Sequence, residues 1–180
     1  MLILASKSPR RKELLEQSQI PFIIDTIETD ETFDKTKSIE DSLLKVSLNK
    51  ALPIKEKHPN DTILSADTIV LVDGIIFGKP KDRNESIYML DKLQGNVHEV
   101  LTGVTIIKGN NTTQFIERTK VYFKKMTIDD INYYIDHFKV SDKAGSYAIQ
   151  EGAIQYIEKI EGSYSNVVGL PIEKVLEYIK

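Results

Sequence analysis

Two adjacent arginines near the N-terminus are the first residues whose type and position indicate a chemistry. Arg10 and Arg11 follow the apolar residues 2–5 and a Ser8-Pro9 pair that favours the start of a helix. The free N–H groups and the positive dipole end of such a helix attract anions, and two guanidinium groups suit phosphate oxygens. An ordinary strand-to-helix junction with two solvated arginines has the same sequence, so this segment alone leaves both interpretations open.

An aspartate that follows an apolar run is the candidate for proton transfer. Asp67 comes after the predicted strand Ile63–Ala66, which places it at the end of a strand, where α/β folds form their ligand crevices. A carboxylate held there can accept a proton or bind Mg²⁺. The alternative is a turn aspartate that caps the next segment.

Two lysines and an acidic loop occur in other segments. Lys50 lies near the end of the second predicted helix, and Lys79 lies between Gly78 and Pro80, which allow close backbone approach and stiffen the segment. An acidic run after the second predicted strand offers hard oxygen ligands for a magnesium ion that phosphates already hold in part. Its members are Glu28, Asp30 and Glu31. Solvated lysines and a solvated loop are the alternatives.

Composition excludes several classes of protein. The chain has 180 residues, enough for one sizeable core, and we expect a single domain over residues 1–180. A net charge of −3 argues against a general grip on nucleic acid polymers or anionic membranes. The absence of cysteine excludes disulfides and thiolate zinc sites. The N-terminal apolar run is too short for a secretory signal or a membrane span, so we expect a cytoplasmic protein.

Other common catalytic motifs are missing. The three histidines share no ligand spacing, and we assign them no catalytic role. The chain has neither a Walker-type glycine loop nor a Gly-x-Ser-x-Gly elbow, which argues against P-loop hydrolysis and serine esterase chemistry.

Hydrophobic periodicity predicts an α/β protein with a mixed sheet. A helix that begins at Ser38 should end before Pro53. The other predicted helices cover residues 9–18, 82–93, 127–138 and 171–180. The predicted strands cover residues 2–5, 22–24, 63–66, 69–72, 75–77, 97–107, 112–123 and 154–160.

Two glycine-containing segments near the C-terminus are predicted loops. Residues 142–150 are rich in glycine and small residues and lead into a strand, as a binding loop does. The amide of Gln150 offers both a donor and an acceptor and can read a base edge. For residues 161–171, plain turn structure is an adequate interpretation.

Six motifs in this order resemble those of the Maf family of nucleoside triphosphate pyrophosphatases. The resemblance spans nearly the whole chain and implies the fold of the related inosine triphosphate pyrophosphatases. That fold is a mixed twisted sheet with flanking helices and two lobes around a central cleft. The motifs are Leu4–Arg11, Asn49–Ala51, Ser65–Thr68, Gly78–Pro80, Asp142–Tyr147 and Glu161–Pro171.

The resemblance implies a role for each residue at a matching position. Asp67 takes the place of the family's proton acceptor, as base, as metal ligand or as both. Arg10, Thr68 and Gln150 match the positions that set base preference. The Asp-Thr pair and the Ile-Gln loop ending are similar to the dTTP/UTP branch rather than to the branch that prefers 7-methyl-GTP. The residues implied in the phosphate and metal site are Ser6, Arg10, Arg11, Glu31, Lys50 and Lys79.

Two segments depart from the family pattern. Glu151-Gly152-Ala153 stands where the family usually has Gly-x-Gly, and Gln94-Gly95-Asn96 replaces a Ser-Gly before a basic residue. Both segments are expected beside the site rather than in its phosphate core.

The resemblance implies hydrolysis of pyrimidine nucleoside triphosphates to the monophosphate and pyrophosphate, as nucleotide-pool housekeeping. Substrates would be dTTP, UTP and modified pyrimidine nucleotides, with Mg²⁺ or Mn²⁺ as cofactor. A homodimer is expected from the resemblance alone. The alternative is a nucleotide-binding regulator without turnover, since members of the family have been linked to septum formation.

Overall fold

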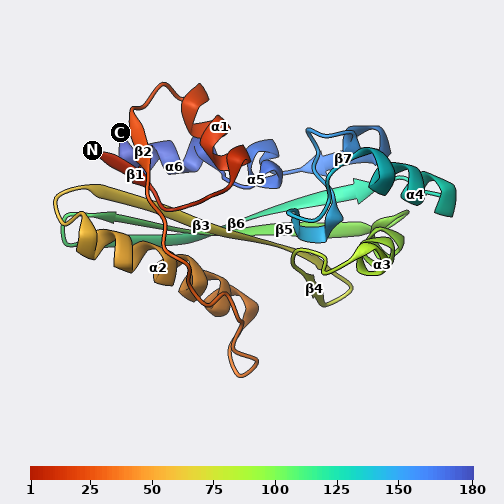
Figure 1. The fold of residues 1–180 in the computed structure, drawn as a ribbon, viewed down its shortest axis with the longest axis horizontal. Coiled ribbons are helices and arrows are strands. Elements are labelled where there is room, and N and C mark those ends of the chain that lie inside the picture. The colour runs from red at the N-terminus through yellow and green to blue at the C-terminus, as the bar shows by residue number, and fades with distance from the viewer. The chain divides into compact units, whose positions relative to one another are not determined.

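A mixed sheet of seven strands forms the framework of the computed structural model, which describes residues 1–180 (Figure 1). The strand order is β2-β1-β3-β5-β6-β7, and β4 pairs with β3. β1 is parallel to both β2 and β3, whereas β4 is antiparallel to β3 and β7 is antiparallel to β6. The predicted mixed α/β sheet is therefore confirmed. The strands are β1 (Leu2–Leu4), β2 (Phe22–Ile24), β3 (Thr62–Val72), β4 (Ile75–Phe77), β5 (Val97–Lys108), β6 (Asn111–Phe123) and β7 (Ile157–Glu161).

Six α-helices and two short 3₁₀-helices complete the chain. None of the helices is both long enough and apolar enough to cross a membrane. The α-helices are α1 (Pro9–Gln17), α2 (Ile39–Lys57), α3 (Arg83–Leu93), α4 (Ile128–His137), α5 (Tyr164–Val168) and α6 (Ile172–Ile179), and the 3₁₀-helices are η1 (Ala144–Ser146) and η2 (Ala153–Tyr156).

The chain folds into two compact units. Unit 1 contains residues 1–67, 102–117 and 169–180, and unit 2 contains residues 68–101 and 118–168. In unit 1, α2 covers one face of the sheet and α1 and α6 cover the other (Figure 1). In unit 2, α3 packs against α4 and η1.

The core of unit 1 lies between α2 and strands β1, β3 and β5. Apolar residues of these elements and of the residue that follows β1 are buried against one another, and the removal of each isoleucine side chain from water stabilises the unit by about 1.5–3 kcal/mol. The members of this cluster are Ile3, Ala5, Ala51, Ile54, Ile63 and Ile107.

The predicted end of the second helix is wrong. Pro53 lies inside α2, which continues to Lys57. A proline lacks an N–H group and removes one helical hydrogen bond. Ala51 and Ile54 on either side are fully buried, and the N–H of His58 still donates to the carbonyl of Ile54. Burial of this face therefore outweighs the lost bond.

Strand β3 also differs from the prediction, because it runs without interruption through Asp67. Its first residues pair with β1 up to Leu64, and its last residues pair with β4. β1 ends at Leu4, opposite Leu64, so its chain turns away three residues before the level of Asp67. Asp67 is thus not at the end of its own strand, as predicted, but beyond the end of the neighbouring parallel strand.

Two C-terminal segments differ from the prediction. The predicted strand 154–160 begins only at Ile157, because Ala153–Tyr156 forms η2 and leaves Ile154 exposed. The segment predicted as plain turn contains α5. In contrast, the helix predicted at Thr127 forms with a complete capping box between Thr127 and Asp130.

The contact between α2 and β5 depends on a residue without a side chain. A Cβ atom added to Gly103 would lie 2.9 Å from Cγ and 3.1 Å from the carbonyl oxygen of Leu43. We expect Gly103→Ala to lower the free energy of unfolding by about 1–3 kcal/mol, because the backbone of α2 must move to accommodate it. Urea denaturation measures this. Gly78→Ala is the control, since nothing lies within 4 Å of its Cβ position. Equal midpoints for both variants would contradict the expected clash.

Candidate functional site

The turn between β1 and α1 forms as its sequence predicts. Ser8 is the N-cap of α1, its hydroxyl accepts a hydrogen bond from the N–H of Arg11 (3.4 Å), and Pro9 occupies the first turn. The hydroxyl of Ser6, which is buried, accepts a hydrogen bond from the N–H of Ser8 (3.2 Å). This places the first N–H groups of the helix directly beyond the end of β1.

The two arginines that follow this turn differ in their surroundings. Arg11 is buried, with Nε donating to the carbonyl of Gly169 (2.7 Å) and a guanidinium nitrogen donating to Ser6 Oγ (3.1 Å). Arg10 is half-buried. Burial lowers the pKa of Arg11 and outweighs the opposing effect of Asp67, while Arg10 lowers this pKa further and Glu31 raises it. The guanidinium of Arg11 is therefore fixed in direction within the field of these three charges.

Lys50 connects α2 to the aspartate of β3. Its Nζ lies 2.8 Å from Oδ1 of Asp67 and 2.9 Å from Oε1 of Glu31. Only 14% of the side chain is exposed at Lys50 and at Asp67, whereas Glu31 is half-exposed. Two carboxylates and an ammonium thus meet at one point in unit 1.

Unit 1 contains six of the predicted site residues. Hydrogen bonds, ion pairs and electrostatic interactions link them into one group that contains both cations and carboxylates. Such a group can hold a polyanion through its cations and a metal ion through its carboxylates. The six residues are Ser6, Arg10, Arg11, Glu31, Lys50 and Asp67.

The donor set suits a divalent cation that is shared with a substrate. No three histidine, aspartate or glutamate side chains come together as a complete metal site. Asp67 and Glu31 nevertheless both reach Lys50 Nζ, so two hard oxygen donors face the same cationic position. Mg²⁺ is commonly bound by one or two carboxylates together with substrate phosphates, so these residues fit such an ion.

The remaining predicted site residues lie in unit 2. Thr68 is half-buried on β3, Lys79 is exposed after β4, and Gln150 is exposed at the end of the loop that follows η1. The N–H of Gly145 donates to the carbonyl of Gly78 (3.1 Å). This bond ties the segment of Lys79 to the loop of Gln150.

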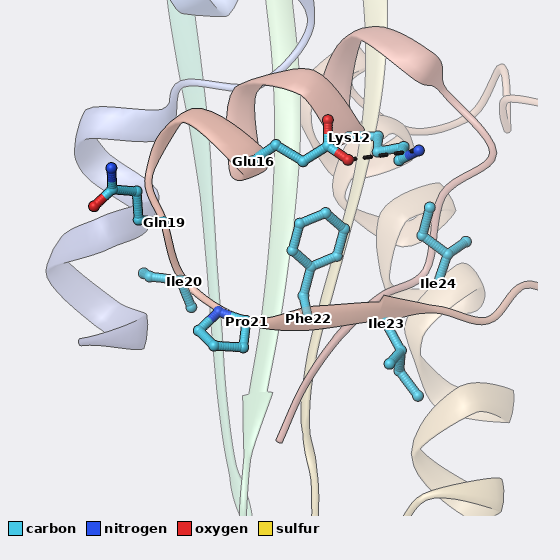
Figure 2. A pocket seen from close by; sticks show the side chains of 8 residues that line it. All are labelled: Lys12, Glu16, Gln19, Ile20, Pro21, Phe22, Ile23 and Ile24. Atoms are coloured by element: carbon cyan, nitrogen blue, oxygen red, sulfur yellow. Dashed lines mark ion pairs between the residues drawn. The ribbon is translucent and has the colours of Figure 1, made fainter.

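An open cavity of about 600 Å³ lies apart from these residues, between α1 and β2 of unit 1 (Figure 2). The ring of Phe22 and the side chain of Ile24 border it from β2, and the ion pair between Lys12 and Glu16 borders it from α1. None of the predicted site residues lines it, so we give the cavity no part in the candidate site.

Sequence reasoning missed one residue that contacts Arg11. Gly169 has a φ of +131°, a conformation that favours glycine, and its carbonyl accepts the hydrogen bond from Arg11 Nε. It lies in the segment that was interpreted as a plain turn. The glycine before Leu170-Pro171 was the available signal, but no local pattern links it to an arginine 158 residues away.

A buried histidine supports the loop of unit 2. Nε2 of His98 is hydrogen-bonded to the hydroxyl of Tyr147 (2.6 Å), and the rings of His98, Phe123 and Tyr147 pack edge to face. Burial lowers the pKa of His98 to about 3. The imidazole is therefore neutral near pH 7 and serves packing and loop position.

Comparison with known proteins gives matches over the full chain. The sequence model of the family described as "Maf-like protein" matches residues 1–180. The dTTP/UTP pyrophosphatase of Bacillus mycoides (strain KBAB4) is 44% identical over 179 residues, covering 99% of this chain and 94% of the relative. That of Pyrococcus abyssi (strain GE5 / Orsay) is 44% identical over 180 residues, covering 100% and 95%. That of Geobacillus sp. (strain WCH70) is 42% identical, covering 99% and 96%.

The depressed pKa of His98 predicts acid sensitivity. Below pH 6.5 the unfolded chain takes up a proton that the folded chain does not bind until about pH 3. Stability should therefore fall as pH drops through this window, by up to about 1.4 kcal/mol per pH unit from this group. Urea unfolding measures the free energy of unfolding at each pH from 7 to 4. This free energy should fall less steeply with decreasing pH in His98→Gln than in the wild type. His137→Gln, at an exposed position, is the control. If it reduced the pH dependence of the free energy of unfolding as much as His98→Gln does, the attribution of acid sensitivity to His98 would be contradicted.

Proposed function

The chain belongs to the Maf family, and from this membership and the site geometry we propose that it hydrolyses dTTP and UTP to the monophosphate and pyrophosphate. The observation that carries the proposal is the convergence of Asp67 and Glu31 on Lys50 Nζ, beside two arginines at the start of α1. Full-length relatives named dTTP/UTP pyrophosphatase support the same reaction and the same substrates.

We assign the site residues to two tasks. The cationic side chains and the hydroxyl of Ser6 bind the triphosphate, while Thr68 and Gln150 contact the base together with Arg10. We also propose that residues 1–180 form the single domain that the resemblance implies. A homodimer and a cytoplasmic location remain predictions. The cationic residues assigned to the triphosphate are Arg10, Arg11, Lys50 and Lys79.

In the proposed reaction a water molecule attacks the α-phosphorus in line with the departing pyrophosphate. Negative charge develops on the bridging and β-oxygens, and fixed cations stabilise it without reorganisation. Arg11 suits this task because its guanidinium is already fixed by Ser6 and Gly169. Asp67, which Lys50 holds in position, orients the water and accepts its proton.

A divalent cation fits the same arrangement. Asp67 and Glu31 would hold Mg²⁺ or Mn²⁺ together with phosphate oxygens. Such an ion would neutralise phosphate charge and would lower the pKa of a coordinated water. The ammonium of Lys50 has three N–H donors, so it can keep its contact with Asp67 while it donates to a phosphate oxygen.

Removal of the proposed base should separate binding from turnover. Asp67→Asn keeps the shape of the side chain and removes its charge, so we expect nucleotide binding to persist and pyrophosphate release to fall by about 10²–10⁴-fold. Calorimetry with dTTP and a coupled pyrophosphate assay measure the two effects. Asp91→Asn, on an exposed position of α3, is the control. Unimpaired turnover in Asp67→Asn would remove Asp67 from the mechanism.

The products identify the reaction class. Purified protein with Mg²⁺ or Mn²⁺ should convert dTTP and UTP to monophosphate and pyrophosphate faster than CTP or GTP. Anion-exchange chromatography resolves these products. Diphosphate with orthophosphate would indicate a γ-phosphate hydrolase instead, and nucleotide binding without any product would indicate a regulator.

A further inference from the structure

A lysine outside the proposed phosphate site is almost completely buried. The side chain of Lys143 is 3% exposed. Its ammonium lies 3.0 Å from Oδ1 of Asp142 and 2.9 Å from Oε2 of Glu151, and it also donates to the carbonyl of Lys139. The three donors of the ammonium thus have three oxygen acceptors.

The burial of this charge depends on its partners. A lysine is almost never fully buried unless it is paired, because removal of an ammonium from water costs several kcal/mol. Asp142 precedes the loop Ala144–Gln150 and Glu151 follows it. Lys143 therefore joins the two ends of this loop, and we call the group Lys143, Asp142 and Glu151 the loop clasp.

The backbone of the loop between the clasp residues has two consecutive residues in the left-handed conformation. Gly145 has a φ of +72° and Ser146 has a φ of +64°. A left-handed conformation is uncommon for serine, and such residues persist where the surrounding structure holds them. The hydroxyl of Ser146 is buried and lies 3.2 Å from both Ser86 Oγ and Met89 Sδ on α3, so its single proton can be donated to either atom.

Two tyrosines hold the second half of the loop. The hydroxyl of Tyr134 accepts a hydrogen bond from the N–H of Ala148 (3.2 Å) and donates one to the carbonyl of Glu151 (3.0 Å). Tyr147 is hydrogen-bonded to His98. Residues 145–149 are buried, whereas Gln150 is exposed at the end of this fixed segment.

We propose that Lys143 is a positioning residue: through the loop clasp it holds Ala144–Gln150 in the conformation that presents Gln150 to the base of the nucleotide. The proposal rests on the proposed function, because it assigns Gln150 to base contact. A loop ordered before binding loses less entropy when the nucleotide binds. Lys143 should therefore affect affinity and discrimination between bases rather than the chemical step.

The first test compares two lysine variants. Lys143→Met removes the charge and keeps most of the apolar stem, and Lys139→Met is the matched control at an exposed neighbouring position. If the loop of Lys143→Met keeps its binding conformation about one-tenth of the time, KM for dTTP rises about tenfold. The preference for dTTP over CTP should fall, while kcat stays within about twofold. Lys139→Met should leave all three values unchanged.

Hydrogen exchange gives a readout that does not depend on turnover. Amides of residues 144–150 should exchange faster in Lys143→Met than in Lys139→Met, while amides of α2 remain unchanged. A wild-type protein that releases no pyrophosphate would defeat the proposed function, and exchange would still test the loop clasp. Unchanged exchange in residues 144–150, or a lowered kcat with unchanged KM and base preference, would overturn the positioning role.

A second variant covers the case in which Lys143→Met does not fold. Glu151→Gln keeps the size of a clasp residue whose side chain is 45% exposed and removes one of the two carboxylates. We expect the same direction with a smaller rise in KM and in exchange. A loss of thermal stability alone, with wild-type KM and base preference, would overturn the proposal.

Discussion

The ion pair between Lys50 and Asp67 is the constraint on which the candidate site depends. α2 and β3 pack through apolar residues, but the hydrophobic effect is non-directional and does not specify where a carboxylate points. The ammonium of Lys50, 2.8 Å from Oδ1 of Asp67, does specify the direction of this carboxylate. The same nitrogen also forms an ion pair with Glu31 of the loop after β2. Because both groups of the pair are largely shielded, this attraction is less screened than an exposed ion pair would be.

Short-range rules predicted the parts of this arrangement that are local. Ser8 and Pro9 start α1 through their own backbone and hydroxyl chemistry, and Thr127 starts α4 in the same way. The failures occurred where tertiary packing overrides local preference. Pro53 is tolerated inside α2 because its buried neighbours hold the helix, and β3 continues through Asp67 because it finds partners on both sides of that residue.

The site residues divide in a similar way. Types and spacing singled out Asp67, the arginines and Lys79, but nothing in the sequence distance between Lys50 and Glu31 predicts a shared contact. The carbonyl of Gly169 and the buried ammonium of Lys143 were beyond sequence reasoning for the same reason. Both groups have partners that only the tertiary fold brings near them. A backbone carbonyl also has no side chain from whose type a contact could be predicted.

The continuity of β3 has a consequence for how base preference can change. Asp67 and Thr68 are consecutive residues of one strand, so the register of β3 sets the face to which each side chain points. An insertion or deletion upstream in β3 would exchange those faces and misplace both groups at once. Replacement of Thr68 alone leaves the register intact. In the role proposed for Thr68, base preference can therefore change through a single substitution at this position, whereas a change in strand length would also displace the carboxylate of Asp67.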